Sequence, residues 1–288
     1  AMGSASPDNN KVSENLENSG ANKEIDPKEL IKKRPGGDEP EVITGTSGDD
    51  LIDGFGGNDT ITGLGGDDIL IGGDGDDVID GGTGTNRLYG DAGDDTITSS
   101  GTDDFVDAGE GNNNIILSSN AQAGIYQSGA GDDIYNLQDG YRSRNNSNRN
   151  SISLKTGAGS DTVNVNTSLE QSTFDLEDGN DIFNWNKKSS SSWTTVTAGG
   201  GNDIINIKDG SNGYFAIYGK DGNDTFNLTG NKLFSRDIYL EGGGGEDIFN
   251  ISGNFSSDYN SIDGGGNDDN IDISNTTGLT ASKTYTWI

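Results

Sequence analysis

A nine-residue repeat is the feature that most limits what this chain can fold into. From Gly45 to Ile116, eight copies follow one another without a gap: GTSGDDLID, GFGGNDTIT, GLGGDDILI, GGDGDDVID, GGTGTNRLY, GDAGDDTIT, SSGTDDFVD and AGEGNNNII. Most copies are rich in glycine, and all have Asp or Asn at the sixth position and an aliphatic residue at the eighth. A short, fixed period is typical of repeat architectures, in which each small unit stacks on the next.

Two positions of the repeat carry the pattern most regularly. The eighth positions, which we expect to point inward as a thin core, are Ile52, Ile61, Leu70, Ile79, Leu88, Ile97, Val106 and Ile115. The sixth positions are Asp50, Asp59, Asp68, Asp77, Asn86, Asp95, Asp104 and Asn113. The pattern matches the nonapeptide G-G-x-G-x-D-x-U-x, so the chain resembles the RTX, or hemolysin-type calcium-binding repeat, family.

The resemblance implies a right-handed parallel β-roll in which two nonapeptides make one turn and each Ca²⁺ lies between the loops of successive turns. It also implies the ligands, because calcium prefers six to eight oxygen atoms. Charge would come from the sixth-position side chains named above. Neutral carbonyl oxygens would come from loops whose glycines are Gly48, Gly57, Gly66, Gly75, Gly84 and Gly93. Asn86 and Asn113 keep an oxygen but lose a charge, so we expect their sites to be weaker or empty.

After residue 116 the period changes, but a Gly-x-Asp-x-apolar motif returns every 20 to 28 residues, at Asp133, Asp161, Asp181, Asp203, Asp224, Asp247 and Asp269. Short alternating strands flank each return, such as SISLK before Asp161 and DTVNV at it. We therefore predict an all-β fold in which the roll of residues 42–116, with two calcium edges, continues as a β-helix over residues 117–288. This second half would keep one calcium edge and end in a cap.

The nine-residue spacing also predicts how the acidic residues stack. With two nonapeptides in each turn, alternate sixth positions fall on opposite edges of the solenoid. One edge would carry Asp50, Asp68, Asn86 and Asp104. The other would carry a single column that runs from Asp59 to Asp269. The alternative is that these residues are simply solvated turn residues, since Asp and Gly are common in turns.

The two ends of the chain lack the repeat. Residues 1–41 begin with a cloning scar, Ala1-Met2-Gly3-Ser4, and are polar, with one possible short helix at 27–33. We predict that they form a disordered leader outside the fold. At the other end, Tyr285, Trp287 and Ile288 suit either a carboxyl-terminal secretion signal or a strand that caps the last turn.

Composition excludes several classes of function. The chain has no Cys and no His, so thiolate chemistry and the common general base are absent, and we expect no enzyme. The net charge of −30 argues against nucleic acid, which needs a basic face, and requires compensating cations if the chain is to fold. No apolar run is long enough to span a membrane.

Two further patterns mark possible surfaces. One is a ladder of outward-pointing amides, either stacked for stability or part of a flat face for ice or glycan beside Thr162 and Thr225: Asn136, Asn164, Asn184, Asn206, Asn227 and Asn250. The other is a loop edge where basic residues gather away from the calcium edge. It would bind a host protein or glycan through Arg142, Arg144, Arg149, Lys187, Lys188 and Trp193. The alternative is that basic residues collect where no calcium is held.

These patterns predict a monomeric, secreted bacterial module that binds several Ca²⁺ ions. By the resemblance, it would pass through the type I secretion machinery unfolded and fold on meeting calcium outside the cell. The competing prediction is a calcium-dependent adhesin or carbohydrate-binding domain that uses the basic loop edge.

Overall fold

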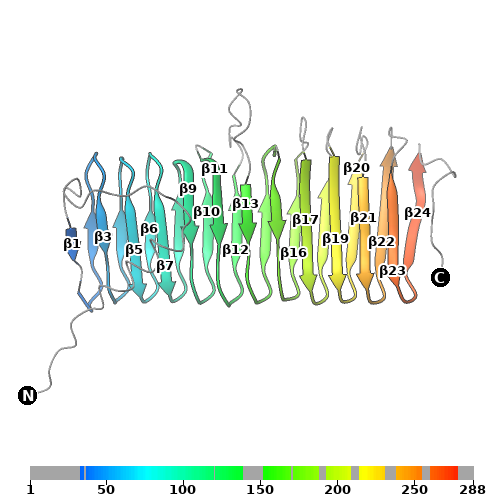
Figure 1. Ribbon diagram of the computed structural model, residues 1–288, viewed down its shortest axis with the longest axis horizontal. Coiled ribbons are helices and arrows are strands. Elements are labelled where there is room, and N and C mark those ends of the chain that lie inside the picture. Colours follow the sequence, from blue (N-terminus) through cyan, green and yellow to red (C-terminus); the bar gives the residue numbers. More distant parts are fainter. Residues whose placement is uncertain are drawn as a thin grey trace, which may run out of the picture.

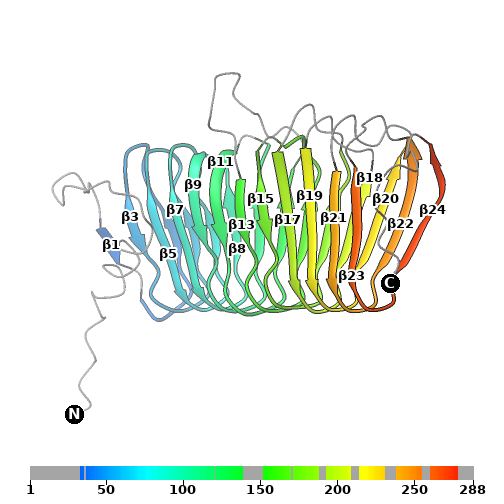
Figure 2. The same cartoon turned by 45° about the vertical axis from the view of Figure 1, so that its right-hand side comes forward.

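The computed structural model describes residues 33–35, 37–119, 121–138, 152–169, 171–187, 193–208, 214–230, 238–254 and 260–277. These residues form two parallel sheets of twelve strands each, and they contain no helix. Figures 1 and 2 show the strands stacked side by side along one long axis, with the colours running in sequence order from end to end. The all-β solenoid predicted from the repeat is confirmed.

Each turn of the solenoid adds one strand to each sheet. The first sheet contains the odd-numbered strands β1 (Lys33–Pro35), β3 (Leu51–Asp53), β5 (Ile69–Asp74), β7 (Arg87–Ala92), β9 (Thr102–Asp107), β11 (Gln122–Gln127), β13 (Ile152–Lys155), β15 (Thr173–Asp175), β17 (Trp193–Gly200), β19 (Tyr214–Asp221), β21 (Ile238–Gly244) and β23 (Ser261–Gly266). All its neighbouring strands pair in parallel, for example Leu51 with Ile69.

The second sheet contains the even-numbered strands β2 (Val42–Thr44), β4 (Thr60–Thr62), β6 (Val78–Asp80), β8 (Thr96–Ser99), β10 (Asn114–Leu117), β12 (Ile134–Leu137), β14 (Thr162–Val165), β16 (Ile182–Trp185), β18 (Ile204–Lys208), β20 (Thr225–Gly230), β22 (Ile248–Asn254) and β24 (Asn270–Thr277). The change of period at residue 116 falls inside β10, which pairs with β8 on one side and β12 on the other. The second half therefore continues the same two sheets.

The core lies between the sheets and is only a few side chains thick. Strand alternation turns the eighth-position residues inward, and all eight of them are buried, as predicted. The second half fills its wider turns with aromatic rings. Phe174 meets Phe183 at 5.0 Å between ring centroids, and Phe226 stacks on Phe249 at 4.5 Å. Among the described residues no helix is long and apolar enough to cross a bilayer.

The amino-terminal end of the solenoid begins earlier than predicted. Strand β1 pairs with β3, the Gly37 carbonyl accepts a hydrogen bond from the Gly56 amide, and the Glu41 amide donates to Asp59. Residues 33–35 and 37–41 therefore belong to the fold, and the leader boundary at residue 41 is too late. Lys33 lies in a strand rather than in the expected short helix, while residues 1–32 lie outside the described residues.

Candidate metal centre: two columns of aspartates

The longer column of sixth-position residues is a continuous hydrogen-bonded ladder. The backbone amide of each residue donates to the side-chain Oδ1 of its counterpart one turn later, from Asp59 to Asp77 at 2.7 Å, then to Asp95 at 2.8 Å and Asn113 at 2.9 Å. The same bond continues without a break through Asp133, Asp161, Asp181, Asp203, Asp224, Asp247 and Asp269. This is the stacking order predicted from the nine-residue spacing.

The shorter column lies on the opposite edge and follows the same rule. The Asp50 amide donates to Asp68 at 2.9 Å, the Asp68 amide to Asn86 at 3.0 Å, and the Asn86 amide to Asp104 at 2.8 Å. From β3 onward, the turns that lead from odd to even strands and carry the long column stay short and similar along the solenoid (Figure 1).

The second carboxylate oxygen of most column residues has no partner among the described residues. Their Oδ2 atoms are buried, and each of the side chains is at most 1% exposed: Asp59, Asp68, Asp77, Asp95, Asp133, Asp161, Asp181, Asp203, Asp224 and Asp247. Burying an acceptor without a donor costs about 1–3 kcal/mol, and a charged group costs more. A cation bound at each of these oxygens would supply the positive charge that the missing donors do not.

Burial raises the pKa of these carboxyl groups well above the ordinary value of 3.8. The pKa of Asp181 rises to about 8, those of Asp95 and Asp224 to about 7, and that of Asp203 to about 6. The backbone hydrogen bond to each carboxylate lowers its pKa, but desolvation outweighs it. Nearby carboxylates, such as Asp161 and Asp203 beside Asp181, raise the pKa further. The groups resist ionisation unless positive charge is supplied.

Hydroxyl groups near the column do not supply the missing donors. The hydroxyls of Ser128 and Thr156 lie near Asp133 and Asp161 and lower the pKa of each carboxyl. Both hydroxyls, however, donate to backbone carbonyls, Ser128 to Thr156 at 2.8 Å and Thr156 to Leu176 at 2.7 Å. The Oδ2 atoms of Asp133 and Asp161 remain without a hydrogen-bond partner in the described structure.

Five of the orphaned oxygens lie near a backbone carbonyl oxygen of the next turn, those of Asp59, Asp68, Asp95, Asp224 and Asp247. A Cβ placed on Gly63 would lie 2.5 Å from Asp68 Oδ2 and 2.6 Å from the Gly81 carbonyl oxygen, so the two acceptors approach the same point. No group of three acidic side chains converges within the described ranges. Backbone oxygens must therefore supply most ligands of any ion here, an oxygen-only set that suits Ca²⁺ and fits the sixth-position Asp residues as its charged members.

The side-chain amides of the two Asn residues in the columns find hydrogen-bond acceptors within their own loops. The Asn113 Nδ2 donates to the carbonyl oxygens of Gly109 and Gly111 in its own loop, at 3.4 and 3.0 Å. The Asn86 Nδ2 likewise approaches the Gly82 carbonyl oxygen at 3.5 Å. The carbonyl groups of these loops therefore point at the sixth-position side chain, where Asn offers N–H donors and Asp offers only another oxygen.

Comparison with known families agrees with this geometry. Residues 35–70, 53–87, 62–97 and 80–115 each match the model of the RTX calcium-binding nonapeptide repeat. Residues 35–115 are RTX repeats. No curated protein matches the chain.

The loop glycines of the RTX repeats are needed for the close stacking of turns. Gly57, Gly66, Gly75, Gly84 and Gly93 all have positive φ, and Gly84, at +125°, is representative. A Cβ on Gly84 would collide with the Gly66 carbonyl oxygen of the preceding turn. Gly48, in the first repeat, does not share this conformation. The assignment of these glycines as carbonyl ligands remains a prediction.

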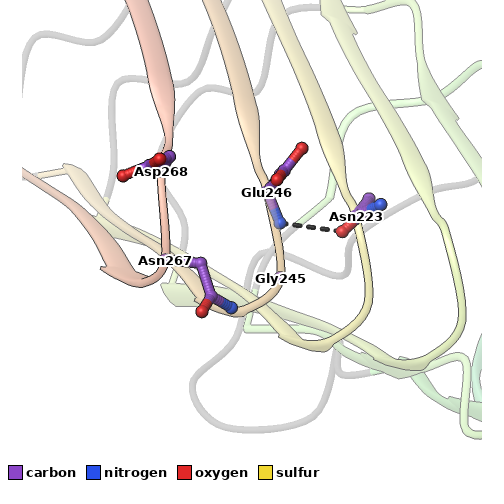
Figure 3. A pocket seen from close by; sticks show the side chains of 5 residues that line it. All are labelled: Asn223, Gly245, Glu246, Asn267 and Asp268. Carbon is purple, nitrogen blue, oxygen red and sulfur yellow. Dashed lines mark hydrogen bonds between the residues drawn. The ribbon is translucent and has the colours of Figure 1, made fainter.

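A second ladder, outside the column, was missed by sequence reasoning. It joins fifth-position side chains, but its donors run the other way: the amide of the later residue donates to Oδ1 of the earlier one, as from Asp67 to Asp49 at 2.7 Å. The same bond joins Glu246 to Asn223 at 2.7 Å in Figure 3. The signal was present as the recurrence of Asp or Asn at position five of most repeats.

Figure 3 also shows an open pocket at the carboxyl-terminal end of this outer ladder, lined by Asn223, Gly245, Glu246, Asn267 and Asp268. The Glu246 and Asp268 side chains are exposed, unlike the buried column residue Asp247 that follows Glu246. Exposed carboxylates are hydrated, so this pocket does not show the desolvation that marks the column.

The amide ladder predicted in the second half is confirmed as a set of stacked amides. The Asn164 Nδ2 donates to Asn136 Oδ1 at 3.0 Å, and Asn184 donates to Asn164 at 3.0 Å. Asn206, Asn227 and Asn250 continue it, and Asn136 also reaches back to Asn114. These bonds link successive turns of the second sheet. A binding role for this face stays a prediction.

The predicted partner site can be followed only in part. Arg142, Arg144, Arg149 and Lys188 lie outside the described residues, and Lys187 is at the end of the part that follows β16. Trp193 begins β17, is 67% exposed, and stacks on Tyr214 at 4.9 Å between ring centroids.

The segregation of positive charge from the calcium edge is incomplete. The Lys155 Nζ lies 2.8 Å from the Glu177 carboxylate and 3.6 Å from that of Asp175, near the turn that leads to Asp181. Lys220 lies near the end of β19, before the turn that leads to Asp224, and its Nζ is 4.9 Å from the centroid of the Tyr218 ring. Two lysines therefore lie near the long-column edge, where they pair with carboxylates or a ring on the outer surface. The gathering of basic residues at the loop edge stays a prediction.

Proposed function

We propose that this protein is a calcium-binding RTX module of a secreted bacterial protein, and that calcium has a structural rather than a catalytic role. The observation that carries the proposal is the set of ten buried aspartate oxygens without a hydrogen-bond partner in the described structure. Nine of them stack along the long column, and five of the ten lie near a carbonyl oxygen of the next turn. Ca²⁺ would supply the missing positive charge in a site made of oxygen atoms alone.

The same observation supports folding that depends on calcium. The net charge is −30, and without cations each turn would bring another carboxylate next to its neighbours. Core side chains are few for each turn, so hydrophobic burial has to compete with this repulsion and with chain entropy. Metal binding and folding are then coupled. The chain stays unfolded where calcium is scarce and folds outside the cell, after passage through the type I secretion machinery.

Far-ultraviolet circular dichroism tests this proposal. Protein freed of calcium with a chelator should give a spectrum of an unfolded chain, and titrated Ca²⁺ should produce the β-sheet spectrum in a cooperative transition. Titration with Mg²⁺, which dehydrates reluctantly and demands octahedral sites, is the control and should have little effect. A β-rich spectrum in chelator above about pH 8, where the buried carboxyl groups are ionised, would contradict calcium-dependent folding, and the absence of bound calcium would contradict the proposal as a whole.

A second candidate function, carbohydrate binding, rests on Trp193. An aromatic side chain that is 67% exposed and stacked on Tyr214 presents a flat apolar ring to solvent at the loop edge. Sugar rings stack on such surfaces. A glycan array that compares the wild-type protein with Trp193→Ala, and with a triple change of Arg142, Arg144 and Arg149 to Ala, tests the idea. If the wild-type protein binds no glycan, or if the variants bind glycans as well as the wild-type protein does, carbohydrate binding through these residues is contradicted.

A further inference from the structure

Four buried residues of the two columns differ from the others in how their side chains are satisfied. Ten aspartates have an orphaned Oδ2, but Asp50, Asn86, Asp104 and Asn113 have no unpaired buried side-chain atom. Asp269, at the end of the long column, is partly exposed, so water can reach its carboxylate. The four buried residues are at most 2% exposed, so solvent does not account for the difference. Donor groups of the chain itself supply the contacts in each case.

The two ends of the short column are capped by hydroxyl and amide donors. Asp50 Oδ2 accepts hydrogen bonds from the Thr46 amide at 2.5 Å and from the Thr46 hydroxyl at 3.0 Å. Asp104 Oδ2 accepts from the Ser99 hydroxyl at 2.6 Å and from the Gly101 amide at 3.0 Å. These donors direct positive hydrogen atoms at the oxygen that a cation would otherwise approach.

The two asparagines replace the cation in another way. Each keeps the Oδ1 that accepts the backbone bond of the ladder, from Asp68 to Asn86 and from Asp95 to Asn113. Each then directs its Nδ2 at loop carbonyl oxygens, two of them in the case of Asn113. The amide N–H groups thus neutralise the acceptors that a calcium ion would need.

We propose that the chain's own donors take the place of calcium at Asp50, Asn86, Asp104 and Asn113. This inference rests on the proposed calcium-binding function. Calcium then belongs almost entirely to the long column, where nine of the ten orphaned oxygens lie, and the short column keeps only Asp68. The short edge is held mainly by protein hydrogen bonds. The roll of residues 42–116 therefore has one calcium edge, interrupted at Asn113, rather than the two that the repeat pattern predicts.

The decisive variant is Asn113→Asp, which restores the aspartate of the repeat. It removes the Nδ2 donor and should leave a new buried oxygen facing Gly109 and Gly111. We expect the number of calcium ions bound at saturation to rise by at least one. The matched control is Asn112→Asp, which adds the same charge to the neighbouring exposed residue, bonded to Asp94 in the outer ladder, and should leave the number unchanged.

Equilibrium dialysis with Ca²⁺, followed by metal analysis, measures these numbers, and circular dichroism in saturating calcium confirms that each variant is folded. A second pair tests the loss: Asp95→Asn should lower the number bound, whereas Asp104→Asn should not. If Asp104→Asn fails to fold, the Asn113→Asp result decides.

Each outcome separates this inference from the function on which it rests. A wild-type protein that binds no calcium overturns both. A wild-type protein that folds with calcium while Asn113→Asp binds no additional ion overturns only the inference. So does a folded Asp104→Asn variant that loses an ion as Asp95→Asn does.

Discussion

Lowering the pH should partly replace calcium. In the folded chain, burial raises the pKa of eight column aspartates from 3.8 to between about 6 and about 8: Asp68, Asp77, Asp95, Asp133, Asp161, Asp181, Asp203 and Asp224. For a carboxyl group whose folded pKa is raised, stability is greatest below the unfolded pKa and is lost as pH rises through the folded pKa. Calcium-free protein is therefore least stable above about pH 8, and it gains stability as the pH falls toward 4.

The magnitude is large enough to decide whether the chain folds. One pKa unit corresponds to about 1.4 kcal/mol. Even buried charges in proteins behave as if the effective dielectric constant were about 20, so we reduce the contribution between pH 8 and pH 5 to about 1 kcal/mol for each aspartate. Eight such groups contribute about 8 kcal/mol, which is comparable with the whole stability of an ordinary domain, about 5–15 kcal/mol.

The assay is circular dichroism of calcium-free protein from pH 8 to pH 5, with size-exclusion chromatography at each pH to exclude aggregation near the isoelectric point of about 4.1. We expect β structure to appear with a midpoint between pH 6 and 7. The matched pair is Asp95→Asn in the buried column and Asp94→Asn in the exposed outer ladder. Only Asp95→Asn should move the midpoint upward. A midpoint near 4, the ordinary value for carboxyl groups, or equal effects of both changes, would refute the reasoning.

The remaining predictions concern the calcium-loaded fold, measured by denaturant unfolding in excess calcium. Phe226→Ala should cost about 3–5 kcal/mol, since it leaves a cavity and removes the ring stacked on Phe249; a loss below about 1 kcal/mol would mean that the core is loosely packed. Asn184→Ala, inside the amide ladder, should cost about 1–2 kcal/mol, and no loss would mean that its amide bonds are replaced by water. Gly201→Ala should cost about 2 kcal/mol or more, because its φ is +125° and a Cβ would strike the Gly179 carbonyl oxygen; a neutral result would show that the turns can separate.

Much of the architecture follows from the sequence because it depends on local periodicity. A repeat of nine residues with Ile, Leu or Val at one fixed place dictates which side chain of each short strand points inward, and those residues, such as Ile61 and Ile97, are buried. The nine-residue spacing also predicts that Asp59 and Asp77 lie one turn apart, and that the column continues past the change of period to Asp133. Covalent spacing fixes these features, so no knowledge of distant contacts was needed.

Other features depend on contacts that spacing does not specify. Pairing of β1 with β3 brings residues before 41 into the fold, although nothing in their composition repeats. The direction of the outer ladder, from Asp67 back to Asp49, depends on how each loop is turned.

The clearest case is the difference between two aspartates with the same place in the repeat. Asp95 and Asp104 both occupy the sixth position, and the sequence assigns them the same role. Only the folded chain shows that Ser99 and Gly101 donate to Asp104, whereas the Oδ2 of Asp95 faces no donor among the described residues. The sequence determines where the carboxylates stack, because stacking follows the period. Tertiary structure decides which of them still need a cation, because that depends on whether another part of the chain directs a hydrogen atom at the second oxygen.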